Sequence, residues 1–213
     1  MRVIVGIGNP GSRYKNNRHN VGFQFLDFFC EKKKLSFKAS KFCYHFSEGQ
    51  LFGDTFVLMR PDTYVNNSGL AVLECINHYK LDVVDLLVVV DDINLDIADI
   101  RIRKSGGDGG HNGLSSIIYN IQSKNFPRLR IGIGSNFQSG NLAEYVLSDF
   151  DKNDFMLLEK SFHLGDQLVE SFISSGYNKM LSTFSRLKNF NKLNKESESV
   201  SYTHLTLPTS DLV

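Results

Sequence analysis

The sequence has few cysteines and no long hydrophobic run. Its three cysteines, Cys30, Cys43 and Cys75, are odd in number and lack the spacings of disulfide frameworks and zinc sites. They therefore predict reduced thiols in a cytoplasmic protein. The longest apolar run, Leu86 to Val90, is too short to span a membrane. The chain also opens on a strand pattern rather than a signal peptide, so we expect neither secretion nor membrane insertion.

The chain also lacks an excess of charge of either sign. It has 24 Lys and Arg against 23 Asp and Glu, a formal net charge of +1. This balance argues against a histone-like binder of polyanions, but it leaves room for a local basic groove. With 213 residues, 41% of them hydrophobic, the chain can bury a core, which excludes wholesale disorder.

Apolar residues at alternating and helical spacings predict strands and helices that follow one another. The valine-rich run Leu86 to Val90 is typical of a strand buried on both faces. The order of elements indicates an α/β fold, a single domain whose mixed, mostly parallel β-sheet is sandwiched by helices, with a helical C-terminal part. The expected strands are 2–7, two within 42–58, 86–90, 100–103 and 129–133, and the expected helices are 20–33, 68–79, 114–122 and 151–188.

The end of the chain changes character twice. Residues 189–199 are polar, which is typical of a loose tail. Residues 200–213 resemble the translation of a transposon sequencing adapter, and a natural β-prone tail is the alternative. The expected organisation is a folded domain over 1–188, a polar tail over 189–199 and a non-native segment over 200–213.

A glycine-rich segment follows the first expected strand. Gly6 to Gly11 matches the GxGxxG pattern of dinucleotide-binding folds, so an NAD(P)-dependent oxidoreductase is one alternative. That fold needs a helix directly after the loop, whereas Pro10 and Gly11 signal a turn and residues 12–17 lack helical periodicity. The favoured interpretation is a turn that places Asn9 at the carboxyl end of a strand, where α/β sites form.

Two histidines and an aspartate are the best candidates for catalysis. His19 precedes the first expected helix, Asp91 closes the buried strand, and His111 follows a glycine loop. An acid at a strand end can orient an imidazole and stabilise its cation. Amide side chains recur at the same junctions and can donate to a developing oxyanion, although turns and caps explain each one singly. They are Asn9, Asn20, Asn66 and Asn112.

Other catalytic signatures are missing from the sequence. It has no GxSxG nucleophile elbow, no HExxH motif and no clustered cysteine and histidine. The remaining chemistry is attack by a water that a His–Asp pair activates, with amides holding a carbonyl group.

Arginines alternate along two of the expected strands. Arg101 and Arg103 share a face of one, and Arg128 and Arg130 share a face of the other with two glycines. Arginines beside glycines predict an accessible basic surface suited to phosphate, and the glycine loop 106–110 adds backbone N–H groups. A solvated strand face is the simpler interpretation of either strand alone. The two together favour a site for nucleic-acid phosphate.

Taken together, these residues resemble the bacterial peptidyl-tRNA hydrolases. The resemblance runs in order from residue 2 to about 188, and several motifs at collinear spacing make it specific. The motifs are Gly8-Asn9-Pro10-Gly11 with Tyr14, Arg18-His19-Asn20-Val21-Gly22, residues 61–69 (PDTYVNNSG), Asp91-Asp92, residues 109–114 (GGHNGL) and residues 128–134 (RLRIGIG).

The resemblance implies a cytoplasmic, monomeric enzyme that hydrolyses the ester of peptidyl-tRNA and so frees tRNA from abortive translation, without a metal or cofactor. By position, His19 is the implied general base and Asp91 its orienting partner. Substrate-binding roles are implied for Asn9, Tyr14, Tyr64, Asn66, His111 and Asn112. Arg103 and Arg130 are the implied clamp for the tRNA 5′-phosphate, and Arg101 extends this basic surface.

Three positions depart from the family pattern. Asn17 stands where Thr or Ser is usual, Asn94 where an Asp is common, and Ser115 where a basic residue is usual. The last weakens the positive charge beside His111, but none removes the His19–Asp91 pair. The alternative from another class is a non-catalytic RNA-binding relative that acts in RNA processing. Such a binder has no need of a general base, so the retained pair argues against it.

Overall fold

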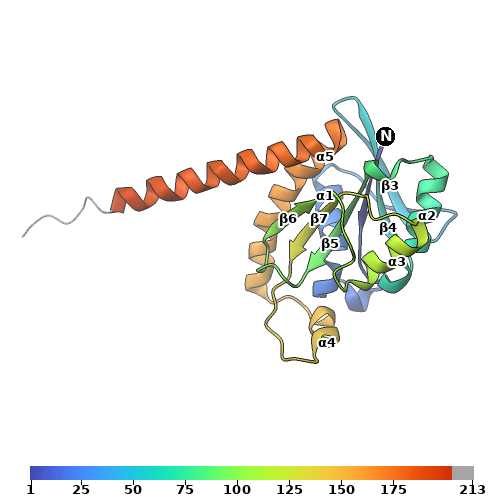
Figure 1. Ribbon diagram of the computed structural model, residues 1–213, viewed down its shortest axis with the longest axis horizontal. Helices are drawn as coiled ribbons and strands as arrows, with labels where there is room; N and C mark the ends of the chain where they lie inside the picture. Colours follow the sequence, from blue (N-terminus) through green and yellow to red (C-terminus); the bar gives the residue numbers. More distant parts are fainter. Residues whose placement is uncertain (203–213) are drawn as a thin grey trace, which may run out of the picture.

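The computed structural model describes residues 1–202, with side chains through residue 190 (Figure 1). One mixed seven-stranded sheet has the order β2-β3-β4-β1-β5-β7-β6. Its central strands β4, β1, β5 and β7 are parallel, and antiparallel pairs flank them. The strands are β1 (Arg2–Gly6), β2 (Lys38–Ala39), β3 (Tyr44–Leu51), β4 (Asp54–Pro61), β5 (Leu86–Asp92), β6 (Ile100–Arg103) and β7 (Arg128–Gly132).

Helices cover both faces of the sheet, which confirms the predicted α/β sandwich (Figure 1). The α-helices are α1 (Val21–Lys32), α2 (Ser68–Tyr79), α3 (Asn112–Ile121), α4 (Leu142–Leu147) and α5 (Lys152–Tyr202). Short 3₁₀ helices are η1 (Ser12–Tyr14), η2 (Arg18–Asn20), η3 (Val65–Asn67) and η4 (Val83–Asp85). Within the described residues, no helix combines the length and apolarity needed to cross a membrane.

Strand β5 divides the core into two apolar layers. Leu87 and Val89 pack with α1 and α5, whereas Leu86, Val88 and Val90 pack with α2 and α3. All seven residues of the strand are buried. The prediction of a strand buried on both faces is therefore confirmed, and Asp91, the next-to-last residue of β5, lies in the interior of the molecule.

Helix α5 extends further than the sequence predicts. It is interrupted at Ser175 and Gly176, where Gly176 has a φ of 74°, and then continues to Tyr202. The polar stretch 189–199, expected as a loose tail, is helical, because nothing from 177 to 202 is glycine or proline. This last part of α5 projects away from the sheet (Figure 1). Residues 203–213 lie outside the described part, so the origin of 200–213 stays a prediction.

The chain crosses between the two halves of the sheet next to β1. From β1 it builds β3 and β4 on one side, and then returns to add β5 and β7 on the other. The carboxyl ends of β1 and β5 therefore flank a topological switch point, where α/β proteins form their sites. After Gly11 the chain forms η1 instead of the long helix that a dinucleotide-binding loop requires.

Glycine at position 22 lets the start of α1 rest directly on these strand ends. A Cβ there would lie 2.6 Å from the backbone N of Ile7 and from the carbonyl oxygen of Val89. No side chain fits at that separation. The close contact brings η2, immediately before α1, over the carboxyl end of β5.

Candidate active site

A cavity of ≈ 620 Å³ opens at the carboxyl ends of β1 and β5. Most of the residues predicted as a site meet there, although they come from six separate segments. Those that line the cavity are Asn9, His19, Tyr64, Asn66, Asp91, His111, Asn112 and Arg130. The lining does not include Tyr14, Arg101 or Arg103.

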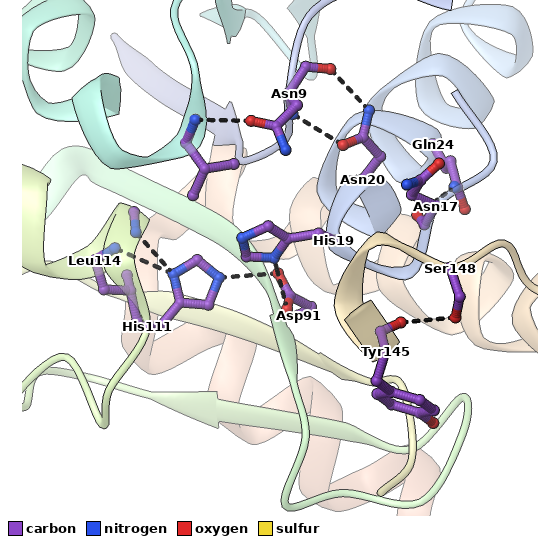
Figure 2. Close-up of polar contacts among 12 residues, drawn as sticks. Asn9, Asn17, His19, Asn20, Gln24, Asp91, His111, Leu114, Tyr145 and Ser148 are labelled. Atoms are coloured by element: carbon purple, nitrogen blue, oxygen red, sulfur yellow. Dashed lines mark hydrogen bonds and ion pairs between the residues drawn. The ribbon is translucent and has the colours of Figure 1, made fainter. Parts of the chain in front are cut away.

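The centre of the cavity holds an imidazole against a buried carboxylate (Figure 2). Nδ1 of His19 lies 3.0 and 2.9 Å from the two carboxylate oxygens of Asp91. Asp91 is only 3% exposed, so it cannot exchange this partner for water. A proton on Nδ1 satisfies the carboxylate and leaves Nε2 with a free lone pair. His19 is therefore arranged to accept a proton through Nε2.

Burial and ion pairing act on both members of the pair. Burial by itself lowers the pKa of His19, but the charge of Asp91 and its hydrogen bond outweigh burial and raise that pKa above the usual value. Burial raises the pKa of Asp91, whereas the His19 and His111 imidazoles and their hydrogen bonds hold it well below its usual range. Asp91 thus stays ionised and stabilises the imidazolium that forms when His19 takes a proton.

His111 reaches the same carboxylate from the other side (Figure 2). Its Nε2 lies 2.9 Å from Oδ1 of Asp91, and its Nδ1 accepts the N–H groups of Gly113 and Leu114 as the N-cap of α3. The two imidazole rings are 4.9 Å apart between centroids. Both ring nitrogens of His111 are engaged within the protein, although the residue also lines the cavity, and its substrate-binding role stays a prediction.

The three side chains are close enough together to raise the question of a metal. Donor atoms of His19, Asp91 and His111 all lie within 4.8 Å of one another. Each imidazole nitrogen that faces Asp91 is already hydrogen-bonded to it, and the other nitrogen of His111 accepts backbone N–H groups. Hydrogen bonds within the protein therefore account for the arrangement of all three side chains.

Asn9 is held by its neighbours in one orientation (Figure 2). Its side-chain oxygen accepts the backbone N–H of Val65 at 3.0 Å, which leaves its Nδ2 as a donor at the cavity. The side chain of Asn20 bonds both the N–H and the carbonyl of Asn9, at 2.8 and 2.9 Å. The sequence predicts no role for Asn20 beyond its place among the junction asparagines, because pairing with another loop has no local signature.

The remaining predicted substrate residues lie at the rim. Asn66 and Asn112 are exposed and line the cavity, at the starts of η3 and α3. Tyr64 is 53% exposed, and the ring of Tyr14 meets it edge-on with 6.3 Å between centroids. Tyr14 therefore contacts Tyr64 but does not itself line the cavity.

The four arginines of β6 and β7 lie on one face, which we call the arginine face (Arg101, Arg103, Arg128 and Arg130). The antiparallel register places Arg101 opposite Arg130 and Arg103 opposite Arg128. Arg103 is exposed, whereas Arg130 pairs with Asp92 at 3.2 Å.

Arg128 departs from the expected accessible surface, because it is 2% exposed. Its guanidinium donates to the carbonyl groups of Gly106 and Gly107 and lies over the ring of Phe126. Burial and the neighbouring Arg130 lower its pKa to about 10. Arg128 thus holds the glycine loop in place. The alternation of residues along a strand predicts which face Arg128 lies on, but not that this loop covers it.

One wall of the cavity comes from α4, which the sequence did not predict. Gly140, Leu142, Ala143, Val146 and Leu147 supply an apolar surface. A helix of six residues is too short to show a clear period, so its signal was missed.

Arg18, next to His19, anchors that wall. Its guanidinium lies 4.8 Å from the ring centroids of both Tyr145 and Phe150 and pairs with Asp154 at 3.0 Å. Its backbone N–H donates to the carbonyl of Ser148 at 2.9 Å. The segment that carries His19 and the wall over the cavity are therefore tied together.

Comparison with known proteins identifies close relatives. The family model described as Peptidyl-tRNA hydrolase matches residues 3–195. The chain is 44% identical over 184 residues to the peptidyl-tRNA hydrolase of Pseudothermotoga lettingae, covering 86% of this chain and 96% of that one. It is 39% identical to that of Clostridium botulinum strain Alaska E43, covering 88% and 97%. The crystal structure of the Acinetobacter baumannii peptidyl-tRNA hydrolase superposes with a TM-score of 0.81 at 32% identity, covering 86% and 93%.

Proposed function

The chain belongs to the peptidyl-tRNA hydrolase family, and from that premise we propose how its residues cleave the ester between a peptide and tRNA. The observation that carries the proposal is the His19–Asp91 contact at 2.9 Å in a cavity lined with amides. An ester needs only an activated water and a stabilised carbonyl oxygen. The side chains of this cavity supply both.

In the proposed reaction, Nε2 of His19 takes a proton from water as the water oxygen attacks the ester carbonyl. The carbonyl oxygen becomes an oxyanion, and the freed Nδ2 of Asn9 is the donor best placed by its neighbours to receive it. When the intermediate collapses, the ribose oxygen leaves and takes the proton from His19. The products are a peptide carboxylic acid, which ionises, and tRNA with a free hydroxyl.

Asn66 and Asn112 are proposed to hold the peptide and the terminal ribose at the rim, where both are exposed. Amide groups suit this task because each can donate and accept. The aromatic ring of Tyr64, supported by Tyr14, offers a flat wall for the terminal nucleotide.

The arginine face is proposed to bind tRNA phosphate. Arg103 is exposed and free to bind, Arg130 connects the face to the cavity, and Arg101 lies beside Arg130 across the strands. Such cations bind phosphate through charge-assisted hydrogen bonds. Replacing Arg130 by alanine is expected to lower cleavage of peptidyl-tRNA more than cleavage of a minimal ester. Equal losses on both substrates would argue against the clamp.

We also propose that the protein is a cytoplasmic monomer. Its folded domain is proposed to end at residue 188 and its polar tail at residue 199. Removal of residues 200–213 is expected to leave turnover and thermal stability unchanged. Sedimentation of the full chain would report its oligomeric state. A large loss of turnover on truncation would show that the terminal segment belongs to the enzyme.

The test of function is cleavage of purified peptidyl-tRNA by the full chain with a metal chelator present. We expect multiple turnovers that release free tRNA at the same rate with and without the chelator. Binding of tRNA without cleavage would favour the RNA-binding alternative. Loss of turnover with the chelator would place a metal in the reaction.

A further inference from the structure

The hydrogen bonds of His111 define where its proton lies (Figure 2). Nδ1 accepts the N–H groups of Gly113 and Leu114 at 3.1 and 3.3 Å, so it carries no proton. The proton is therefore on Nε2, which lies 2.9 Å from Oδ1 of Asp91. His111 donates to the carboxylate as a neutral imidazole.

The start of α3 keeps His111 in this state. A second proton would have to bind Nδ1, where two backbone N–H groups already point. Of the two histidines in the cluster, only His19 has a nitrogen free to take up a proton.

The carboxylate of Asp91 thus accepts hydrogen bonds from two imidazole rings. His19 contacts both carboxylate oxygens, and His111 contacts one of the same two. A hydrogen bond to a carboxylate stabilises its negative charge and leaves less of it to attract a neighbouring cation.

We infer that His111 is a positioning residue that holds Asp91 toward His19 and moderates how strongly Asp91 favours the protonated form of His19. This inference rests on the roles proposed above for His19 and Asp91. A general base works best when it is largely unprotonated at the working pH and still basic enough to take a proton. Without the second donor, the ionised Asp91 would keep His19 protonated, and inactive, to a higher pH.

Other ionisable groups around His19 have partners elsewhere or lie at the rim. Arg18 turns away to Asp154, and the hydroxyl of Tyr145 on α4 donates to the carbonyl of Ile133. The remaining groups from the packed elements are Asp92 with Arg130, Tyr64, and the exposed Glu144 of α4. Among the described residues, the hydrogen bonds of the His19 ring are those to Asp91.

The test compares His111→Asn with His111→Ala. Asparagine keeps a side-chain acceptor for the N-cap of α3 but is too short to reach Asp91, whereas alanine removes both interactions. The acid limb of kcat/KM for peptidyl-tRNA is expected to move upward by about 0.5–1 pH unit in both variants. Only alanine should also lower Tm through loss of the cap. An acid limb at the wild-type pH in His111→Asn, with kcat/KM reduced equally at every pH, would overturn the inference in favour of a substrate contact.

A measurement on the unaltered protein guards against a variant that fails to fold. Nitrogen NMR of the histidine rings is expected to show the proton of His111 on Nε2 in the active enzyme. A proton on Nδ1 of His111 instead of Nε2 would contradict the inference. If the NMR result contradicted the role of His111 but His19→Ala still lost turnover, the proposed function would stand. If His19→Ala retained turnover, both the proposed role of His19 and the inference about His111 would be wrong.

Discussion

The cluster of His19, Asp91 and His111 and the arginine face hold their charged groups in different surroundings. In the cluster, His19, Asp91 and His111 are held by one another and by the start of α3, out of bulk water. On the arginine face, Arg128 is buried under the glycine loop, whereas Arg103 is exposed to solvent. Reacting groups gain from fixed geometry and low dielectric, whereas a group that binds and releases a polyanion needs a free, solvated charge.

The largest effect is expected where the cluster loses its charge, in Asp91→Asn. This variant should lower kcat by about 10³–10⁴-fold, because a neutral amide cannot stabilise the imidazolium of His19. Since Asp91 raises the pKa of His19, its loss should move the acid limb of the residual activity to lower pH. The pH profile of kcat, with Tm as a check on folding, measures both. An acid limb that moves upward would show that Asp91 acts in another way.

A smaller loss of kcat is expected from Asn9→Asp, which tests whether the side-chain N–H of Asn9 is needed beside the cluster. The carboxylate keeps an acceptor for the N–H of Val65 but replaces the free donor with negative charge. We expect kcat to fall by at least about 10²-fold, the size of one lost oxyanion donor. Single-turnover cleavage measures it, and a rate near wild type would remove Asn9 from the oxyanion site.

On the arginine face, Arg103→Ala should weaken binding and leave chemistry intact. We expect the salt dependence of log kcat/KM for peptidyl-tRNA to become shallower by about 0.9 for one lost phosphate contact, with turnover of a minimal ester unchanged. Lys160→Ala, which removes an exposed cation from α5, is the matched control. An equal change in the control would mean that net charge, and not this face, sets the effect.

The smallest effect on turnover is expected at Arg18, which supports the cluster from outside. Arg18→Ala should lower the free energy of unfolding by about 2–4 kcal/mol, because it leaves Asp154 buried without its partner. It should lower kcat/KM by less than about tenfold. Arg18→Lys should recover the ion pair but not the planar contact with Tyr145 and Phe150. Denaturant unfolding with kinetics measures both, and a loss as large as that of Asp91→Asn would place Arg18 in the chemistry.

Much of the fold could be predicted, because its signals are local. The run Leu86 to Val90 is apolar on both faces, and the structure buries it on both. The helix expected over 68–79 is found as α2 with those bounds. The antiparallel placement of β6 and the wall from α4 could not be predicted, since pairing direction and a six-residue helix leave no periodic pattern.

Some features of the site could likewise be predicted from the sequence, and others could not. That His19 and Asp91 would meet could be expected, because strand ends converge at one edge of an α/β sheet. The two nitrogens of His111, the pairing of Asn20 with Asn9 and the burial of Arg128 depend on contacts between distant segments. Residue type and spacing do not encode those contacts, so sequence reasoning named residues but not the direction in which they point.

The most direct test of the account is single-turnover cleavage of peptidyl-tRNA by His19→Ala. With Tm and tRNA affinity close to those of the wild type, we expect the rate to fall by about 10²–10⁴-fold, the contribution of a positioned general base. A folded His19→Ala variant that cleaves peptidyl-tRNA within a few-fold of the wild-type rate would contradict the assignment of His19 as the base.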